Sequence, residues 1–497
     1  MIRWSAKEVG RHLHDLPMLR VVLPVVGGIL AESLLELPGL YLWGGVVVAG
    51  GCALRFRSSL YITVALLLLG MGCASLHRHE AAPPMGEGLY VVRVESQPVL
   101  RERYSTASAH LVAWCDKQGV WRGSEKRLSL YADSTLTIRI HEELTLRGRL
   151  RPYREADSFY ARLQAARGYV GMLWASESAL LQRDSSRGPG WIEGLHLKGT
   201  DGIARMGLSP ENRAVVEAMT IGERSHLTPA LRESYARSGA SHLLAVSGLH
   251  VGILFLFINA LMWGLPLLNG GHRLKALIAT AAIWLYALVA GASPGVLRAA
   301  WMFTALQLAH AFSLRYRGLN ILFGVAVVML LLEPRQLFDI SFQLSFLAVV
   351  AILSWGAPLL RGQHNRFFKG LAALFLIGGV ATLATAPLSV YRFGIFAPIG
   401  VVINPVVIFT AELLLGLTLL ALFIPAGPAL LGWAVEWTAS LQNEVVRRAA
   451  EWEWGSFDLQ SDGTTTLLIY LFLILMTLAA WGLKRIKPLK LEDDDLG

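Results

Sequence analysis

The chain contains 497 residues, of which 54% are hydrophobic and only 16% are charged. Soluble proteins carry about 25% charged residues, so this composition excludes a water-soluble globular protein, a disordered chain and a basic protein that coats nucleic acid. The net charge of +9 indicates first cytoplasmic loops rich in Lys and Arg, and only second an anionic ligand. Cys52, Cys73 and Cys115 show no metal-ligand or redox spacing, so no disulfide framework is expected.

Three apolar stretches near the N-terminus predict three membrane spans, Leu19–Leu35, Leu40–Leu54 and Leu60–Leu76. Because they follow one another so closely, they do not resemble a cleaved signal peptide. The basic N-terminus and the pair Arg55 and Arg57 are signals of cytoplasmic loops. Three crossings from an inside start leave the next segment outside the membrane.

Residues 86–190 differ from the rest of the chain, because short runs there alternate apolar and polar residues as β-strands do. The runs are Leu89–Val94, Ser108–Trp114, Leu128–Tyr131, Leu144–Leu150 and Tyr169–Trp174. Five strands in about 100 residues predict an external OB-like barrel, although other small barrels fit nearly as well.

Residues 191–240 are predicted to form amphipathic helices. Ser209-Pro210 and Thr228-Pro229 each combine an N-cap residue with a proline at the first helical position. The apolar spacing from Ala214 to Ile221 suits a helix that lies either on the bilayer or on other helices.

Beyond residue 240 the chain is almost wholly apolar and predicts eight further spans. These are Leu243–Leu265, Ala276–Val289, Leu297–Phe312, Leu319–Leu332, Phe342–Leu360, Leu371–Val390, Val401–Phe423 and Leu467–Leu483. Eight crossings from outside would leave the basic C-terminus outside, against the positive-inside rule. We therefore expect a broken, re-entrant or additional segment within Ile395–Asn443, at Asn404-Pro405 or at Pro425 and Pro428.

Polar residues inside apolar spans are informative, because each costs free energy unless it faces a partner or water. The densest group lies in Ser241–Gly252, where Ser247 and His250 are spaced to share one helix face. Gly248 and Gly252 there permit close backbone approach. Tight helix packing is one interpretation. Two histidines and two serines within twelve residues favour a functional face.

Two further stretches carry polar residues. In Gly291–Ala299 a Pro-Gly step interrupts the helix before Arg298, which either snorkels to the interface or stands at the mouth of a path for an anion. In Asp339–Phe346, Gln343 is explained most simply by hydrogen bonding between helices.

Ser241–Gly252 resembles the signature of the ComEC competence proteins, the inner-membrane component of bacterial DNA uptake. The resemblance continues through Gly291–Ala299, Asn320 and Phe338–Ile352 to Asn404-Pro405. It implies a polytopic α-helical membrane protein with an external OB-like domain inserted after three N-terminal spans, which conducts single-stranded DNA into the cytoplasm during natural transformation. The implied candidates for the translocation path are Ser241, His242, Ser247, His250, Arg298, Asn320, Gln343, Ser345 and Asn404.

Many members of this family also carry a C-terminal metallo-β-lactamase-like domain. We expect this chain to be a short form without it, with no metal, no cofactor and no enzymatic activity, served by a separate nuclease. The pairs His12/His14 and His77/His79 lack the rest of a metal motif. No ATP-binding loop is recognisable, yet moving one negative charge inward against 100 mV costs about 2.3 kcal/mol. A cytoplasmic helicase-like ATPase and a periplasmic DNA receptor are therefore expected partners.

In the external domain, cations and aromatic rings alternate in a way that suits phosphates and bases. The candidates for DNA binding are Arg101, Arg103, Tyr104, Trp121, Arg122, Arg147, Arg149 and Arg151. Acidic residues are interspersed, so a solvated barrel surface explains the pattern equally well without the family resemblance.

The sequence thus predicts three N-terminal spans (1–80), an external β domain (86–190), amphipathic helices (191–240), a transmembrane channel domain (241–484) and a cytoplasmic tail (485–497). Two alternatives remain open. One is a secondary transporter or exporter of another anionic substrate, and the other is a membrane-anchored binding or assembly protein.

Overall fold

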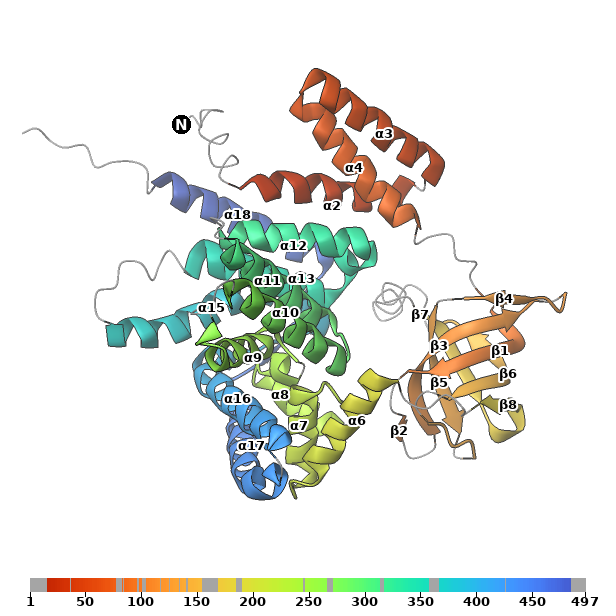
Figure 1. Cartoon of the computed structure of the whole chain (residues 1–497), viewed down its shortest axis with the longest axis vertical. Helices are drawn as coiled ribbons and strands as arrows, with labels where there is room; N and C mark the ends of the chain where they lie inside the picture. The colour runs from red at the N-terminus through yellow and green to blue at the C-terminus, as the bar shows by residue number, and fades with distance from the viewer. Residues whose placement is uncertain are drawn as a thin grey trace, which may run out of the picture.

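The computed structural model describes residues 16–483 except 36, 77–82, 84, 96–97, 101–103, 117, 125, 134, 140–141, 154–168, 185–189, 245, 266–270, 313–316, 357–365 and 425. These residues form a helical body and a β-barrel that lies to one side of it, beyond helix α6 (Figure 1). The described part of the chain is therefore organised around two separate hydrophobic interiors.

The three N-terminal stretches form helices α2 (Pro17–Leu35), α3 (Gly39–Phe56) and α4 (Ser59–Leu76). Helices α2 and α4 cross very closely, because a Cβ atom on Gly28 or on Gly70 would overlap a backbone carbonyl of the opposite helix. Apolar residues of α2 also pack against α12 (Gly318–Leu332), so the N-terminal helices dock on the C-terminal half of the chain.

The β domain is a closed five-stranded barrel whose strands follow one another in space as β1-β3-β5-β7-β6, with β1 pairing back to β6. Strands β5 and β7 are parallel, and the other neighbours in the barrel are antiparallel. The barrel strands are β1 (Gly86–Val94), β3 (Tyr104–Cys115), β5 (Arg127–Asp133), β6 (Glu143–Arg151) and β7 (Tyr169–Ala175). The five predicted runs each lie within one of these strands.

Alternation of buried and half-buried or exposed residues along the strands produces the interior of the barrel, which is lined by residues such as Tyr90, Leu111, Leu130 and Leu146. Three short strands extend the sheet. They are β2 (Val99–Leu100) and β4 (Trp121–Gly123), which pair with β3, and β8 (Leu180–Asp184), which pairs with β6.

Three amphipathic helices follow the barrel, α6 (Trp191–Ala204), α7 (Pro210–Thr220) and α8 (Pro229–Arg237). As the sequence predicts, α7 and α8 begin at prolines, and Thr228 caps α8 by accepting a hydrogen bond of 3.2 Å from the backbone N–H of Leu231. Eight of the 11 residues of α7 are buried, in a core shared with two C-terminal helices. The sequence predicts that this helix lies either on the bilayer or on other helices, and in the structure α7 packs on other helices.

The C-terminal half is almost wholly helical. Its elements are η2 (Ser241–Leu244), α9 (Gly248–Leu261), α10 (Gly271–Val289), α11 (Pro294–Ala311), α12, η4 (Pro334–Phe338), α13 (Ile340–Ala351), η5 (Ile352–Gly356), α15 (Arg366–Phe393), α16 (Ile399–Phe423), α17 (Gly427–Glu451) and α18 (Gly463–Leu483). A short ribbon of β9 (Ile395–Phe396) and β10 (Phe457–Asp458) joins the start of α16 to the segment after α17. Within the described residues, six helices are long and apolar enough to cross a membrane: α2, α3, α4, α10, part of α15 and α16.

The predicted irregularity within Ile395–Asn443 is an additional helix. A break at Asn404-Pro405 is wrong, because Pro405 lies inside a continuous α16. The chain instead turns just after α16, where Ala426 adopts a left-handed conformation (φ 62°), and α17 then returns antiparallel along α16. Apolar periodicity did not reveal α17, because its buried face carries Thr438, Gln442 and Asn443.

We expect the barrel to lie outside the membrane, as the charge pattern predicts. In a variant whose Cys52 and Cys73 are replaced by serine, the half-buried Cys115 at the end of β3 should react with a membrane-impermeant maleimide on intact spheroplasts. A Ser5→Cys control on the predicted cytoplasmic N-terminus, made without Cys115, should react only after permeabilisation. Labelling of Cys115 that required permeabilisation would contradict the arrangement.

Candidate functional site

The serine and histidine singled out in the sequence meet at the start of a helix. Ser247 precedes α9 as its N-cap, and its hydroxyl accepts a hydrogen bond of 3.4 Å from the backbone N–H of His250. In return, the His250 Nδ1 accepts a bond of 3.1 Å from the backbone N–H of Ser247. The prediction that both residues share a face of one continuous helix from Leu243 is therefore wrong, because the helix begins at Gly248.

The segment around this cap joins two hydrophobic cores. Leu243 and Leu244 belong to the core of α6, α7, α8, α16 and α17, whereas Val246 and Val251 belong to the core of α9, α10 and α11. Between these apolar anchors and just before them, Ser241, His242 and Gly248 are exposed. The signature stretch thus lies at a seam between two bundles and presents polar groups there.

His250 itself is fully buried, with 0% of its surface exposed. Its Nδ1 serves the cap, but its Nε2 has no hydrogen-bond partner among the described residues. A buried ring nitrogen without a partner loses its hydration without replacement, at a cost of about 1–3 kcal/mol. A buried polar atom without a partner is rare in native proteins and calls for an explanation. A water molecule or a ligand bound during function would supply the missing hydrogen bond.

Arg298 is the second buried polar residue of the seam. It lies in the second turn of α11, is only 6% exposed, and its guanidinium carbon lies 5.8 Å from the centre of the Phe346 ring of α13. Its Nε and Nη1 have no hydrogen-bond partner among the described residues, and the buried Asp339 acts on its charge electrostatically. Burial inside the protein excludes snorkelling to the membrane interface.

The structure brings the first two sequence stretches together, because α9 packs on α11. A Cβ on Gly248 would lie 3.5 Å from the Ala299 side chain, and one on Gly252 would lie 3.3 Å from the Phe303 ring. The neighbours of both glycines are side chains, so the predicted close approach of backbones is not found at either. The carbonyl of Val246 lies beside Gly295, which places the cap of α9 next to the first turn of α11.

The remaining candidates for the path are dispersed. Asn404 of α16 is 8% exposed, and its Oδ1 has no partner among the residues that the structure describes. It lies beside Gly400, which packs against the Ser238–Gly239 turn. Gln343 of α13 donates a hydrogen bond of 2.9 Å to the carbonyl of Leu337, which lies in the preceding short helix η4. Asn320 and Ser345 are half-buried on α12 and α13.

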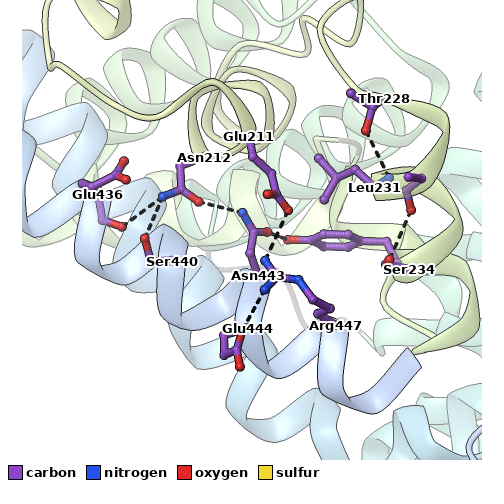
Figure 2. Close-up of polar contacts among 12 residues, drawn as sticks. Glu211, Asn212, Thr228, Leu231, Ser234, Glu436, Ser440, Asn443, Glu444 and Arg447 are labelled. Atoms are coloured by element: carbon purple, nitrogen blue, oxygen red, sulfur yellow. Dashed lines mark hydrogen bonds and ion pairs between the residues drawn. The ribbon is translucent and has the colours of Figure 1, made fainter. Parts of the chain in front are cut away.

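A contrasting polar network, which the sequence did not reveal, joins α17 to α7 and α8 (Figure 2). Asn443 donates to Asn212 over 2.7 Å and accepts from the Tyr235 hydroxyl over 2.8 Å. Asn212 also donates to Ser440 over 2.7 Å, and Gln442 donates to the Tyr235 hydroxyl over 3.0 Å. Because these buried groups satisfy one another, the network rigidifies the bundle.

A third polar junction attaches α6 to the end of α10. His196 Nδ1 lies 2.8 Å from the carbonyl of Val289, and its Nε2 lies 3.7 Å from the Glu223 carboxylate. The hydrogen bond with Glu223 raises the pKa of His196 above its usual value, although burial opposes this. Burial alone would raise the pKa of Glu223, but the hydrogen bonds from His196 and Ser225 hold it at about 2. Glu223 is thus ionised near neutral pH.

The same junction needs a glycine at position 222. Gly222 has a φ of +78°, and a Cβ there would lie 2.6 Å from the carbonyl of Ala290. Tyr286 adds a hydrogen bond of 3.0 Å to the carbonyl of Thr220. The end of α10 is thereby held against the α7–α8 connection, immediately before the Gly291–Ser293 turn that leads to Arg298.

The candidates for DNA binding lie on different strands of the β domain. Arg147, Arg149 and Arg151 alternate along β6 and are exposed, and Tyr104 is half-buried on β3. Trp121 is 48% exposed on β4, where Arg122 forms an ion pair of 3.1 Å with Asp116. Arg101 and Arg103 lie outside the described residues, as do the histidine pairs His12/His14 and His77/His79.

Across the described ranges, no group of three or more His, Cys, Asp or Glu side chains is arranged to hold a metal ion. The geometry therefore offers hydrogen-bonding and charged groups for a ligand, at the seam and on the barrel.

Residues 219–484, more than half of the chain, match the family model described as competence protein. The chain belongs to this family. The match runs from the end of α7 through α18 and includes both polar stretches. Together with the apolar helices it makes the chain a multi-pass membrane protein with a barrel-like domain.

Curated relatives agree with the family. The chain is 28% identical to ComE operon protein 3 of Bacillus subtilis (strain 168) over 285 residues, which cover 56% of this chain and 35% of that protein. It is 33% identical to an uncharacterized protein of Aquifex aeolicus (strain VF5) over 215 residues, 42% of this chain and 48% of that one. It is 28% identical to competence protein ComA of Neisseria gonorrhoeae over 305 residues, 59% and 42% respectively.

The chain spans about a third to a half of the length of these relatives. No solved structure matches it.

The network in Figure 2 predicts a large stability effect at Asn443. Replacing Asn443→Ala removes the acceptor of the buried Tyr235 O–H and the donor to the side-chain amide oxygen of Asn212. We expect the free energy of unfolding to fall by about 1–3 kcal/mol, seen as a lower midpoint of heat denaturation in detergent. Arg448→Ala removes an exposed ion pair of the same helix and should shift the midpoint little. Equal midpoints for the two variants would refute the role of the network.

Proposed function

We propose that this chain acts in DNA uptake during competence, as an inner-membrane channel that conducts single-stranded DNA into the cytoplasm. Family membership supports a role in competence, and the relative from Neisseria gonorrhoeae is named competence protein ComA. The observation that carries the channel proposal is a pair of buried residues, His250 and Arg298, where the two polar stretches of the family domain meet. Within the described part of the chain, His250 Nε2 and the Nε and Nη1 of Arg298 have no hydrogen-bond partner.

The physical argument is one of solvation. A phosphate placed in hydrocarbon loses its hydration, at a cost that only polar groups or water along the path can offset. The polar groups of α17 are satisfied by one another and are therefore part of the frame. By contrast, His250 Nε2, Arg298 Nε and Nη1, and Asn404 Oδ1 have no hydrogen-bond partner among the described residues, and these are the groups available to a hydrated strand.

The proposed topology places both termini in the cytoplasm and the barrel in the periplasm. Helix α17 packs along α16, a helix apolar enough to span the membrane, so we place the two at the same depth. If α17 counts as a crossing, the number of crossings after the barrel becomes odd, and the basic C-terminus then lies inside.

We further propose that the barrel is an OB domain that receives the strand outside. Its strand order β1-β3-β5-β7-β6, closed by the pairing of β1 with β6, is that of a five-stranded Greek-key barrel with one parallel pair. Exposed arginines on β6 supply cations for phosphates.

A channel of this kind needs partners. Each nucleotide brings one negative charge, and inward movement against 100 mV costs about 2.3 kcal/mol per charge. We propose that a cytoplasmic helicase-like ATPase supplies the pull, a periplasmic receptor presents the DNA, and a separate nuclease degrades the other strand.

One alternative is supported by a specific observation. A buried Arg298 beside the interrupted start of α11 would also suit export or import of another anionic substrate. A purely structural assembly protein would have no use for buried polar atoms without partners.

A deletion strain separates these functions. We expect that, without the chain, added DNA still becomes protected from external nuclease but no transformants appear, because entry to the cytoplasm is blocked. Normal transformation of the deletion strain would refute the proposed channel. Loss of nuclease-protected DNA as well would place the chain at an earlier step.

The path residues predict a second result. His250→Ala, Ser247→Ala and Arg298→Gln should abolish or strongly reduce DNA entry at normal protein level in the membrane. Thr418→Ala is the matched control, because its buried hydroxyl already donates over 2.7 Å to Leu414 of its own helix. Normal transformation in all three path variants would remove the path role. Loss of the variant proteins from the membrane would instead show that the cap at Ser247 serves helix stability, which is the packing interpretation.

A further inference from the structure

The outer face of the barrel carries three neighbouring aromatic rings that no sequence pattern indicated as a group. Tyr104, Tyr131 and Trp174, here called the aromatic row, come from β3, β5 and β7. Tyr131 and Trp174 stack with ring centres 4.7 Å apart and planes at 18°, and Tyr104 meets the Trp174 ring edge-on at 5.5 Å. Trp174 remains 41% exposed, so its ring is open to a ligand.

The strand register sets arginines beside this row. Arg149 of β6 is the direct antiparallel partner of Trp174, and Arg151 is the partner of Met172. Partners in antiparallel strands point to the same face, and their Cβ atoms lie about 5 Å apart. Arg147, Arg149 and Arg151, here called the arginine stripe, are all exposed and follow one another every second residue, about 6.8 Å apart.

The row and the stripe form one continuous surface. Thr106 pairs with Tyr131, Tyr131 with Trp174, and Trp174 with Arg149, so a single line of side chains crosses β3, β5, β7 and β6. With strands about 4.8 Å apart, this line is about 14 Å long. Cations lie at one side of it and ring faces at the other.

Resting on the proposed role in DNA uptake, we propose that this surface is the strand-binding site of the barrel. The phosphates of a single strand follow the arginine stripe on β6, and its bases lean across β7 and stack on the exposed Trp174, which Tyr131 supports from behind. Stacking on an aromatic ring combined with a cationic track is how proteins bind single strands without sequence preference.

The same geometry sets limits on this site. Glu87 of β1 is the register partner of Arg149 on its other side, so part of the positive charge is offset and binding should be weak. Trp121 and Arg122 do not belong to the surface, because β4 pairs with the far end of β3 and Asp116 engages Arg122. Of the candidates named from sequence, Tyr104 and the arginine stripe therefore belong to this surface, whereas Trp121 and Arg122 do not.

The test measures binding of a fluorescent oligothymidine to the full-length chain in nanodiscs of uncharged lipid. Trp174→Ala should weaken binding about 5- to 140-fold, which is the stacking free energy of one base converted at 1.4 kcal/mol per factor of ten. Trp174→Phe, which keeps a ring, should retain most of the affinity. Trp121→Ala, an equally exposed tryptophan of the same barrel, is the matched control and should bind as the unaltered chain does.

Salt dependence tests the stripe separately. Arg149→Gln should lower the slope of log affinity against log salt by about 0.7, the value expected for one phosphate contact on a single strand. Equal affinities of the Trp174→Ala and Trp121→Ala variants, or an unchanged slope for Arg149→Gln, would overturn the proposed surface.

The two proposals fail in different ways. If deletion of the chain leaves DNA entry intact, the channel function fails whatever Trp174 does in the binding assay. If deletion abolishes entry while Trp174→Ala binds like the control, the channel function stands and only this surface is refuted.

Discussion

The helical body depends on one constraint, that a polar atom removed from water must find a partner inside the protein. The amides and hydroxyl of Asn212, Tyr235 and Asn443 obey it completely and tie α17 to α7 and α8. His250 Nε2 and two nitrogens of Arg298 do not obey it within the described residues. The first group holds α17, α7 and α8 in one arrangement, whereas the second group lies on α9 and α11 and has lost its hydration.

The constraint also explains why polar residues gather at one seam. The core of α9, α10 and α11 and the larger core around α16 and α17 each bury their apolar faces, and the signature stretch crosses between them. The polar groups of this stretch therefore lie at the boundary between the two cores and interrupt neither of them.

Much of this architecture could be predicted from sequence, for physical reasons. Strict alternation marked β3 and β5, and hydropathy marked α16, because burial imposes both patterns. Hydropathy missed α17, whose inner face is polar, and it misplaced the start of α9, where the cap at Ser247 decides the boundary. The site was less predictable: Trp174 meets Arg149 only through strand register, which pairs residues 25 positions apart in the chain and leaves no local signal.

The connection between barrel and seam follows from continuity of the chain. Helix α6 leaves the barrel directly, and His196 holds it to the last carbonyls of α10 while Gly222 lies against Ala290. The next residues form the Gly291–Ser293 turn, and α11 then carries Arg298 into the seam within its second turn. A strand held on the outer face of the barrel would therefore be bound to a domain whose first helix is anchored beside the start of the proposed path. The two ring nitrogens of His196 face the Val289 carbonyl and the Glu223 carboxylate, so one side chain links α6 both to the end of α10 and to the segment that follows α7.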